Sequence, residues 1–556
     1  MVPAAEKTPR EVLLHPTIGS IRGVCTFPGV VQYLGIQYAT LKDRFSRGEL
    51  KQNHPGGPDG VLNATELGPI PLSPPNGCEH EHLLIQKSLP YSPFRQSDTQ
   101  CLTLNITAPR SCDSSRAPVL VFVHGGAFAT GSSSYPQYDL GPITHMSVEM
   151  GTPIVAVGIN YRVGAPGFLH SAAMRDAGYK INNGLNDQKL ALRWIKRNIA
   201  GFGGDPDKVT LVGESAGGVS GCFHLQSAEP LFHQLVAMSG SSLQRLRRPE
   251  QAEKSYTSVI EAIGAKELPP REQLQRLLDT PKEDLLSKVG RRFPIGPLLD
   301  GDSIPETTTF DSLRDGEKFV KLFPGVHYCR RVMMGDCQMD GMAFNSRVSG
   351  RVDILSKTLR DCLATVFDPI DVKITPSIVS AYGLDTTAAS NAAETIEPVL
   401  NFGNDVMFAL PARAFARAWS SSGLPGAEAF LCHFNCPNPW DGPWKGHATH
   451  IQDIAFVLQN YRDSLSVGQR RCAERYARDI IAFVNTAPPW PAYHHGVKPG
   501  SMVYFAPEEG DIDQSQFVSD EAPERTGRRD ILQRLVPEEM SDKLVDVWQM
   551  FMLGPQ

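Results

Sequence analysis

The sequence predicts an α/β protein with a large, mostly parallel central sheet flanked by helices, and two observations support this. Between residues 116 and 222, strand-length apolar runs such as PVLVFV (118–123) and PIVAVGI (153–159) alternate with longer stretches of helical periodicity. Such alternation is typical of consecutive β-α-β units. The chain has 556 residues, 41% of them hydrophobic and 21% charged, so it can bury a large core.

The clearest helix of this region is predicted at 186–199, NDQKLALRWIKRNI. Its basic side chains fall largely on one face, and its apolar residues fall on another: Leu190, Trp194, Ile195 and Ile199. We therefore expect it to lie on the sheet with the basic face in water. The helix should end at GFGGDP (201–206), because glycine and a following proline are helix stop signals.

The next apolar run leads into GESAGG (213–218), where Ser215 stands between Gly213 and Gly217. Glycines on both sides remove the Cβ atoms that would clash in a sharp turn from a strand to a helix. This is the pattern of a nucleophile elbow, G-x-S-x-G. An ordinary glycine-rich loop is the alternative, but the strand before Ser215 and the helix after it favour the elbow.

A second motif supports this interpretation. VFVHGGAF (121–128) is a strand that runs into His124 and two glycines, Gly125 and Gly126. Adjacent glycines let the backbone present N–H groups to a developing oxyanion. Together with the N–H of Ala216, they would make an oxyanion hole with three donors. By itself the motif slightly favours a tight turn after a strand, but beside an elbow it favours the oxyanion hole.

Composition excludes several classes of partner. The formal net charge of −6 and a pI near 6.2 give no basic surface for nucleic acid. The most apolar runs are far shorter than the roughly 20 residues of a membrane-spanning helix. The first 19 residues lack the apolar region of a signal peptide. The motif CEHEH (78–82) contains metal-ligand types, but no second cluster at zinc spacing completes it, so we expect no metal.

Along most of its length the chain resembles the type-B carboxylesterases and cholinesterases of the α/β-hydrolase fold. The resemblance rests on motifs in the order of that family: YLGIQYA (33–39), CLTLNI (101–106), HGGAF (124–128), NYRVGAPGFL (160–169), NGLNDQKLALRWIKRNIAGFGGDP (183–206) and GESAGG (213–218). It implies one catalytic domain over residues 1–556, with helical insertions near 245–290 and 350–430, and no cofactor.

The resemblance also implies a triad in the order Ser, acid, His. The acid is expected in MDGMAF (339–344), which offers Asp340; Asp336 is the alternative. Members of the family mostly have Glu here, so the shorter Asp requires compensation by the backbone position. The histidine is expected in GHATHIQDIAFVL (446–458). His450 fits, because Asp453 and Phe456 then match an acid and an aromatic of the family; His447 is the alternative.

The family resemblance implies roles for other residues less specifically. Glu214 and Ser239 match residues that support the histidine or a bound water in the family. One family disulfide could survive as Cys78–Cys101, whereas a second has no candidate cysteines between 222 and 329. A third is replaced by two apolar residues, Leu410 and Val545. With no signal peptide, this pattern predicts a reducing compartment, and we expect the cytoplasm.

The implied activity is hydrolysis of a small-molecule carboxylic ester through an acyl-enzyme on Ser215. Three alternatives stay open. An acyltransferase or lactone-forming enzyme would use the same residues with an alcohol in place of water. An amidase would cleave a harder bond. A non-catalytic binding protein is disfavoured, since such relatives lack the nucleophile.

Finally, YSPFRQSDTQC (91–101) places Tyr91 as a substrate-pocket candidate where cholinesterases have a tryptophan that binds quaternary ammonium. A tyrosine ring attracts cations more weakly than a tryptophan ring does. We predict that uncharged esters are preferred, and that a cationic ester loses about 1 kcal/mol, or several-fold in kcat/KM, compared with a cholinesterase. Measuring kcat/KM for a choline ester and for its neutral carbon isostere tests this, and a clear preference for the charged ester would contradict it.

Overall fold

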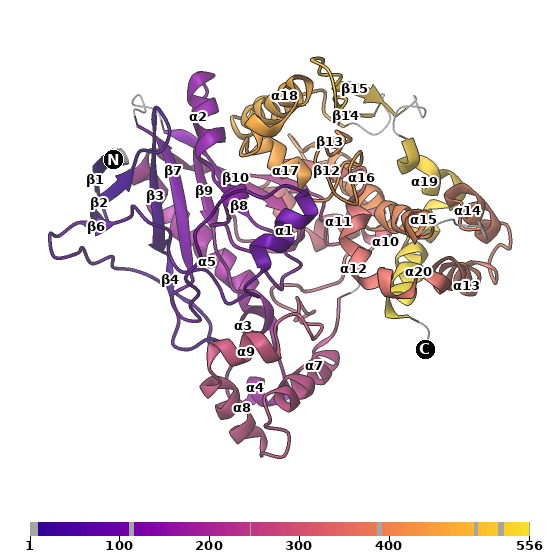
Figure 1. Ribbon diagram of the computed structural model, residues 1–556, viewed down its shortest axis with the longest axis horizontal. Coiled ribbons are helices and arrows are strands. Elements are labelled where there is room, and N and C mark those ends of the chain that lie inside the picture. The colour runs from indigo at the N-terminus through magenta and orange to yellow at the C-terminus, as the bar shows by residue number, and fades with distance from the viewer. Residues whose placement is uncertain are drawn as a thin grey trace.

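A twisted sheet of 13 strands runs through the molecule and carries helices on both faces (Figure 1). The computed structural model describes residues 9–110, 116–244, 246–385, 392–493, 499–520 and 527–554. In spatial order the sheet contains β1 (Arg10–His15), β2 (Gly19–Val24), β3 (Val30–Gln37), β7 (Thr103–Pro109), β9 (Val155–Ile159), β8 (Ala117–Val123), β10 (Gly204–Glu214), β11 (Gln234–Met238), β12 (Arg331–Cys337), β13 (Glu428–Phe434), β14 (Gly500–Tyr504) and β15 (Gln516–Ser519). β6 (Leu62–Asn63) pairs with β2, and β4 (Ala39–Thr40) pairs with β5 (Glu49–Leu50) in a separate ribbon.

The seven central strands from β9 to β14 are parallel to one another, and the antiparallel pairs lie toward the two edges of the sheet. β9, β11 and β12 are buried along their whole length. Strands covered on both faces are expected to be continuously apolar, as these are. The predicted mostly parallel sheet flanked by helices is confirmed, and it has the α/β-hydrolase fold.

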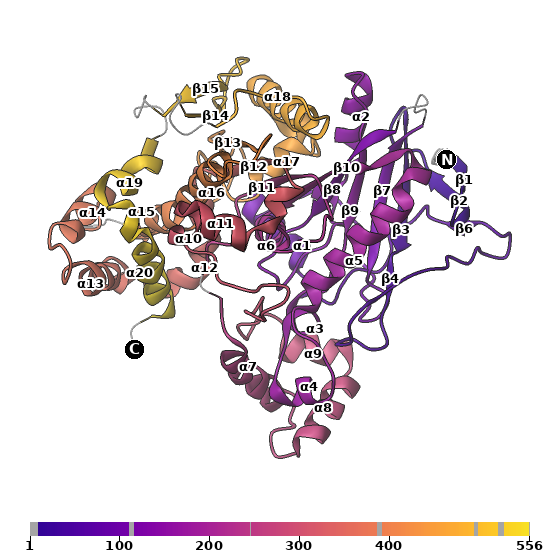
Figure 2. The same cartoon turned by 180° about the vertical axis from the view of Figure 1, so that it is seen from behind.

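Side chains of β8 alternate between two cores. Val119, Val121 and Val123 point into one apolar cluster with α5 (Asn183–Asn198), while Leu120 and Phe122 join another with α18 (Val467–Val484). This follows from the two-residue period of a strand, which sends successive side chains to opposite faces. Figure 2 shows α5 on the face of the sheet opposite to α18.

The predicted helix at 186–199 is present, but it begins three residues earlier, at Asn183. Asn182 precedes it in the left-handed region, with φ of 54°, which asparagine tolerates better than most residues do. Its side-chain amide donates to the carbonyl of Leu298 and to Asp300, both at 2.8 Å, and this holds the turn in place. Trp194 is buried and Arg193 is exposed, so the predicted orientation of the helix is confirmed.

The remaining helices connect or cover the strands. They are α1 (Gly77–Ile85), α2 (Gly141–Glu149), α3 (Gly164–Phe168), α4 (Ala172–Asp176), α6 (Ala216–His224), α7 (Pro249–Ala262), α8 (Pro270–Asp279), α9 (Lys282–Lys288), α10 (Phe310–Arg314), α11 (Gly316–Leu322), α12 (Asn345–Val348), α13 (Leu355–Phe367), α14 (Ile374–Tyr382), α15 (Ala392–Asn404), α16 (Leu410–Ser420), α17 (Gln452–Val457), α19 (Ile531–Leu535) and α20 (Ser541–Leu553). Within the described ranges, no helix has the length and apolar character required to cross a membrane.

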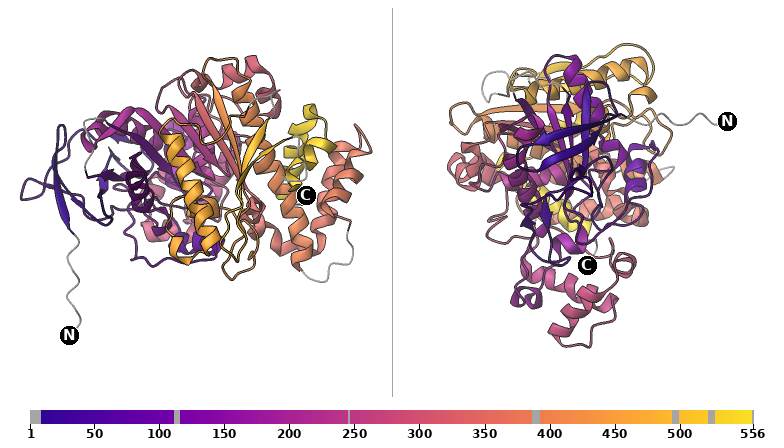
Figure 3. Two further views of the ribbon diagram at one scale, coloured as in Figure 1. Left: turned by 90° about the horizontal axis from the view of Figure 1, so that it is seen from above. Right: turned by 90° about the vertical axis from the view of Figure 1, so that its left-hand side faces the viewer.

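Helices occur where insertions were predicted. α7, α8 and α9 form the part of the molecule that lies lowest in Figure 1. α13 packs against α20 near the C-terminus (Figure 3), whereas α16 packs on β12 and β13. The amphipathic stretch 273–289 is divided between α8 and α9, because Pro281 interrupts the helical hydrogen bonding and begins a new helix. Tyr256, Val259 and Leu277 belong to a small apolar cluster of this region.

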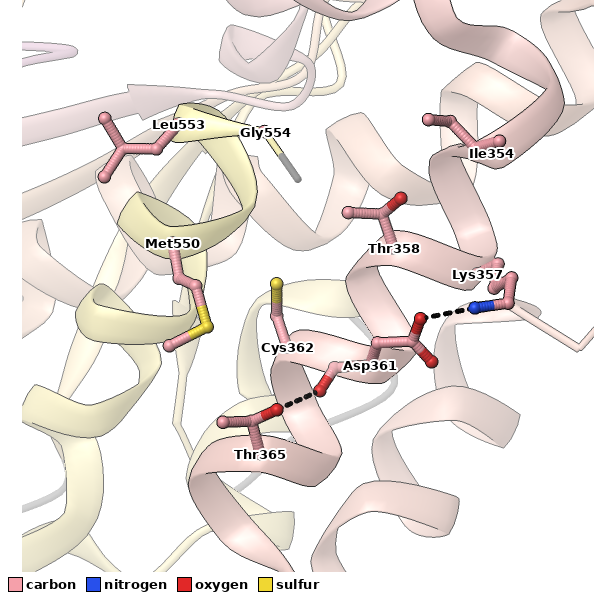
Figure 4. A pocket seen from close by; sticks show the side chains of 9 residues that line it. All are labelled: Ile354, Lys357, Thr358, Asp361, Cys362, Thr365, Met550, Leu553 and Gly554. Carbon is pink, nitrogen blue, oxygen red and sulfur yellow. Dashed lines mark hydrogen bonds and ion pairs between the residues drawn. The ribbon is translucent and has the colours of Figure 1, made fainter. Parts of the chain in front are cut away.

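The C-terminal helix α20 packs against α13 with a buried stripe of Leu544, Val547, Trp548 and Phe551. Leu410 and Val545, expected to replace a disulfide by apolar packing, are both buried. A groove of about 540 Å³ runs between α13 and α20 (Figure 4). Its lining includes Ile354, Cys362, Met550 and Leu553 but none of the predicted site residues, so this groove is not the predicted active site.

A buried ion pair joins α5 to the segment after β9. Nε and Nη2 of Arg162 donate to the two carboxylate oxygens of Asp187, each at 2.7 Å, and Nη1 donates to the carbonyls of Arg44 and Ser46. Both side chains of the pair are almost completely excluded from solvent. Desolvated charges are costly unless they are fully paired, so the pair stabilises the fold only while both partners are present.

We predict that Arg162→Met lowers the free energy of unfolding by about 3–5 kcal/mol, because it leaves the Asp187 carboxylate uncompensated in the interior. Arg193→Met is the matched control. Arg193 lies on α5 and pairs with Glu229 in an exposed bridge, so its loss should cost less than about 1 kcal/mol. Urea unfolding of both variants measures the difference, and equal losses would contradict the prediction.

Candidate active site

Ser215 occupies a strained turn between β10 and α6. Its φ of 52° and ψ of −119° lie outside the regions that serine normally adopts. A Cβ added to Gly217 would overlap the carbonyl of Val123, and one added to Gly213 would overlap the backbone of Gly217. The glycines of the motif are therefore required for close backbone approach, as the elbow pattern predicts.

Three residues from distant parts of the chain form one line of hydrogen bonds. Nε2 of His450 lies 3.0 Å from Oγ of Ser215, and Nδ1 of His450 lies 2.7 Å from Oδ1 of Asp340. Asp340 begins a 3₁₀ turn after β12, and His450 lies in the loop between β13 and α17. Asp340 is completely buried and His450 is 4% exposed. This is the geometry of a nucleophile, a base and an acid that orients the base.

The alternative residues have other partners. Asp336 faces His433 on the neighbouring strand, with Oδ2 at 2.9 Å from Nδ1, and Nε of Arg529 donates to its Oδ1 at 2.5 Å. Burial tends to raise the pKa of Asp336, but Arg529 and His433 outweigh it and hold the pKa at about 2. His447 is partly exposed beside the ring of Trp444. The structure thus brings Asp340 and His450 to Ser215, rather than Asp336 and His447.

The short side chain of Asp340 is held by its own turn. The backbone N–H of Cys337 donates to Oδ2 at 2.7 Å, while Oδ1 faces His450. The N–H of Gly341 donates to Oδ1 of Asn404 at 3.0 Å. Both carboxylate oxygens therefore have partners, and the backbone brings them within reach of the imidazole despite the shorter side chain.

Gly125 and Gly126 follow β8 directly beside the elbow. A Cβ on Gly125 would overlap the carboxyl group of Glu214 and approach Cβ of Ser215, so only glycine fits there. His124 stabilises this loop, with its ring stacked on Tyr161 at 4.4 Å between centroids. Burial lowers the pKa of His124 to about 4, which keeps the ring neutral. Ala216 is the first residue of α6, adjacent to Ser215.

Glu214 and Ser239 differ in what they contact. Oε1 of Glu214 lies 3.4 Å from Nε2 of His450, and the side chain is completely buried. Burial, with a smaller effect of Asp453, raises the pKa of Glu214 well above its ordinary value, which favours its protonated form. Ser239 instead donates to Sγ of Cys337 at 3.8 Å, and it therefore contacts the strand that leads to Asp340.

Two further buried acids near His450 were not predicted as site residues. Burial, with a smaller effect of Asp340, raises the pKa of Asp453 to about 7. Glu81 is 3% exposed, and its Oε2 accepts a hydrogen bond from Gln137 at 2.8 Å; burial raises its pKa to about 7. Glu81 belongs to CEHEH (78–82), the motif considered above for its metal-ligand residue types. Helical spacing would have revealed it, since Cys78, Glu81, His82 and Ile85 form the buried face of α1.

The implied disulfide is wrong for this structure. Cys78 and Cys101 are both free thiols. Cys78 lies on α1 in the apolar cluster that contains Phe122, whereas Cys101 packs in the other cluster, so the two thiols belong to different cores. Sγ of Cys78 instead lies 3.9 Å from Nε2 of His82. In the described part of the chain, no three His, Cys, Asp or Glu side chains are grouped to hold a metal ion.

Tyr91 lies at the surface beside α1. The side chain is 38% exposed, its hydroxyl donates to Glu79, and its ring stacks on Phe94 at 5.2 Å. Phe94 in turn contacts the buried ring of Tyr135. The assignment of Tyr91 to a substrate pocket stays a prediction.

Stability should depend on the proton of Glu81. The folded protein holds this proton up to about pH 7, whereas the unfolded chain releases it near pH 4.5. Stability is therefore lost as pH rises through this interval, by at most about 3 kcal/mol. We predict that Glu81→Gln gains stability relative to the parent protein at pH 8 but not at pH 4.5. Urea unfolding across this range measures it, with Glu79→Gln on the exposed face of α1 as control. The same pH dependence in Glu81→Gln and the parent protein would contradict the prediction.

Comparisons with known proteins show the family of the chain. Residues 10–499 match the model of the carboxylesterase family. The para-nitrobenzyl esterase of Bacillus subtilis is 29% identical over 511 residues, which cover 86% of this chain and 91% of that protein. The cholinesterase of Mus musculus is 31% identical over 319 residues, or 54% of this chain and 50% of that one.

Solved structures give the same result. A PNB esterase structure superposes with a TM-score of 0.71 at 26% sequence identity, covering 95% of this chain and 99% of that one. The family match extends over nearly the whole chain and includes the elbow, the glycine loop and both loops that carry the acid and the histidine. The chain therefore belongs to the carboxylesterase family, and it is a carboxylic ester hydrolase.

Proposed function

We propose that this protein hydrolyses small-molecule carboxylic esters through an acyl-enzyme on Ser215, with His450 as general base and Asp340 as the acid of the triad. The observation that carries the proposal is the continuous line of hydrogen bonds from Oγ of Ser215 through both nitrogens of His450 to Asp340. No cofactor takes part in this chemistry.

The proposed reaction has two halves. Nε2 of His450 takes the proton of Ser215 while Oγ attacks the ester carbonyl carbon, and backbone N–H groups of Gly125, Gly126 and Ala216 stabilise the oxyanion. When the tetrahedral intermediate collapses, the C–O bond to the alcohol breaks and His450 returns the proton to the leaving oxygen. Water then adds to the acyl-enzyme with the same proton transfers, and the acid leaves.

Glu214 supports this cycle as a neutral neighbour of Nε2. A second ionised carboxylate at 3.4 Å would compete with Ser215 for the imidazole. Burial raises the pKa of Glu214, and in its protonated form this side chain can instead hydrogen-bond a water beside the histidine. Ser239 has a supporting place in this proposal, since it contacts Cys337 three residues before Asp340.

We further propose that the whole chain acts as one catalytic unit, with helical insertions near 245–290 and 350–430. Ser215, Asp340 and His450 come from segments more than 100 residues apart and still share one hydrogen-bonded site. A cytoplasmic location is consistent with ten free cysteines in the described ranges. With a net charge of −6, nucleic acid is not proposed as a partner.

We predict that Ser215→Ala and His450→Ala each lower kcat by about 10⁴ to 10⁶ without unfolding the protein, because each removes a member of one acting unit. His447→Ala is the matched control and should keep its activity. Turnover of an uncharged aryl ester, with circular dichroism to monitor folding, measures both. A fully active His450→Ala variant beside an inactive His447→Ala variant would reverse the assignment. An organophosphonate adduct on a serine other than Ser215, found by mass spectrometry, would refute the nucleophile.

A further inference from the structure

The turn that carries Asp340 is held from behind by the C-terminal part of the chain. A short 3₁₀ turn, Gly527–Asp530, places Arg529 against the end of β12. Nε of Arg529 donates to Oδ1 of Asp336 at 2.5 Å, and Nη1 donates to Oδ1 of Asn435 at 2.8 Å. Asp336 is completely buried, and 4% of the Arg529 side chain is exposed. A buried charge pair of this kind fixes both backbone segments that carry it.

Arg528 contacts the same turn at Gln338, two residues after Asp336. Its Nη2 donates to the backbone carbonyl of Gln338 at 2.7 Å, and its Nε donates to Asp405 at 3.0 Å. Asp405 also accepts hydrogen bonds from Tyr382 at 2.6 Å and from the amide of Asn404 at 3.1 Å. Asn404 in turn accepts from the N–H of Gly341. Arg528 therefore hydrogen-bonds to the backbone of the turn on one side and to a buried polar network on the other.

The opposite side of this turn faces the loop that carries His450. The N–H of Met339 donates to the carbonyl of Ala448 at 2.9 Å, two residues before the histidine. The N–H of Ala448 donates to the side chain of Gln338 at 3.3 Å. The turn is thus held between the histidine loop and the two arginines, so its position sets the distance from Asp340 to His450.

We propose that Arg528 and Arg529 are positioning residues for Asp340, which together clamp the turn 336–341 so that the short acid reaches His450. The proposal rests on the proposed function, in which Asp340 orients the base. An aspartate has one methylene fewer than a glutamate, and it must therefore be brought closer by its backbone. Asp336 and Gln338 are the two points on the turn where the arginines apply this constraint.

The test replaces each arginine in the full-length protein. Arg528→Met and Arg529→Met should lower kcat by about 10- to 100-fold with KM nearly unchanged, since small displacements of catalytic groups have effects of this size. Arg331→Met is the matched control. Arg331 is a buried arginine at the opposite end of β12, where it pairs with Glu428 at 2.9 Å, and its loss should leave kcat per folded molecule unchanged.

Two further measurements separate positioning from general stability. In an Asp340→Asn background, neither arginine variant should reduce kcat further, because the clamp acts through Asp340. Arg528→Lys and Arg529→Lys keep the charge and should recover part of the activity. If the Met variants do not fold, the Lys variants decide, with an expected loss of several-fold in kcat only.

Unchanged kcat in the folded Met variants, or in the Lys variants where the Met variants do not fold, would overturn the clamp, as would an equal loss in the Asp340→Asn background. These outcomes are distinct from failure of the proposed function. If Ser215→Ala is inactive and the arginine variants are fully active, only the clamp is wrong. If Ser215→Ala keeps full activity, the proposed function itself is wrong.

Discussion

The hydrogen bond of 2.7 Å between Asp340 and His450 is the contact on which the rest of the site depends. It joins the turn after β12 to the loop before α17, 110 residues apart, and it directs the second ring nitrogen of His450 toward Ser215. Asp340 begins only a short 3₁₀ turn and His450 lies in a loop, so neighbouring structure must hold both. The parallel strands do part of this, because β10, β12 and β13 all end at the same edge of the sheet.

The buried carboxyl groups around this contact differ in their tendency to ionise. Burial favours protonated Glu214, Glu81 and Asp453, which would otherwise repel Asp340 and one another. Asp336, only four residues before Asp340, instead remains ionised because Arg529 and His433 compensate it. Four carboxyl groups thus lie near a fifth that the proposed chemistry uses as an anion. Because these carboxyl groups are chemically alike, their surroundings determine which of them are ionised.

The nucleophile and the acid are held in place by different kinds of contact. Gly125, Gly213 and Gly217 allow backbones to approach where a Cβ would overlap a neighbour, and this puts Ser215 in its strained turn. Gly213 and Gly217 adjoin Ser215 in the chain, so this part of the constraint is local, whereas Gly125 lies 90 residues before Ser215. The acid, by contrast, is positioned by residues from 404–405 and 528–529, which come together only in the folded chain. The nucleophile and the acid therefore depend on different kinds of constraint.

Local sequence patterns are sufficient to predict the parallel sheet, the two faces of α5, the elbow at Ser215 and the glycine loop, because each depends on residues that adjoin in the chain. Motif order also favours Asp340 over Asp336 and His450 over His447, but it leaves Asp336 and His447 open as alternatives. Only the tertiary structure separated them, since the choice rests on which side chain faces which strand. The same holds for the free thiols of Cys78 and Cys101, the surface position of Tyr91, the buried acid at Glu81 and the contacts of Arg528 and Arg529. These features arise between segments distant in sequence, where packing and desolvation decide the outcome and no local pattern records it.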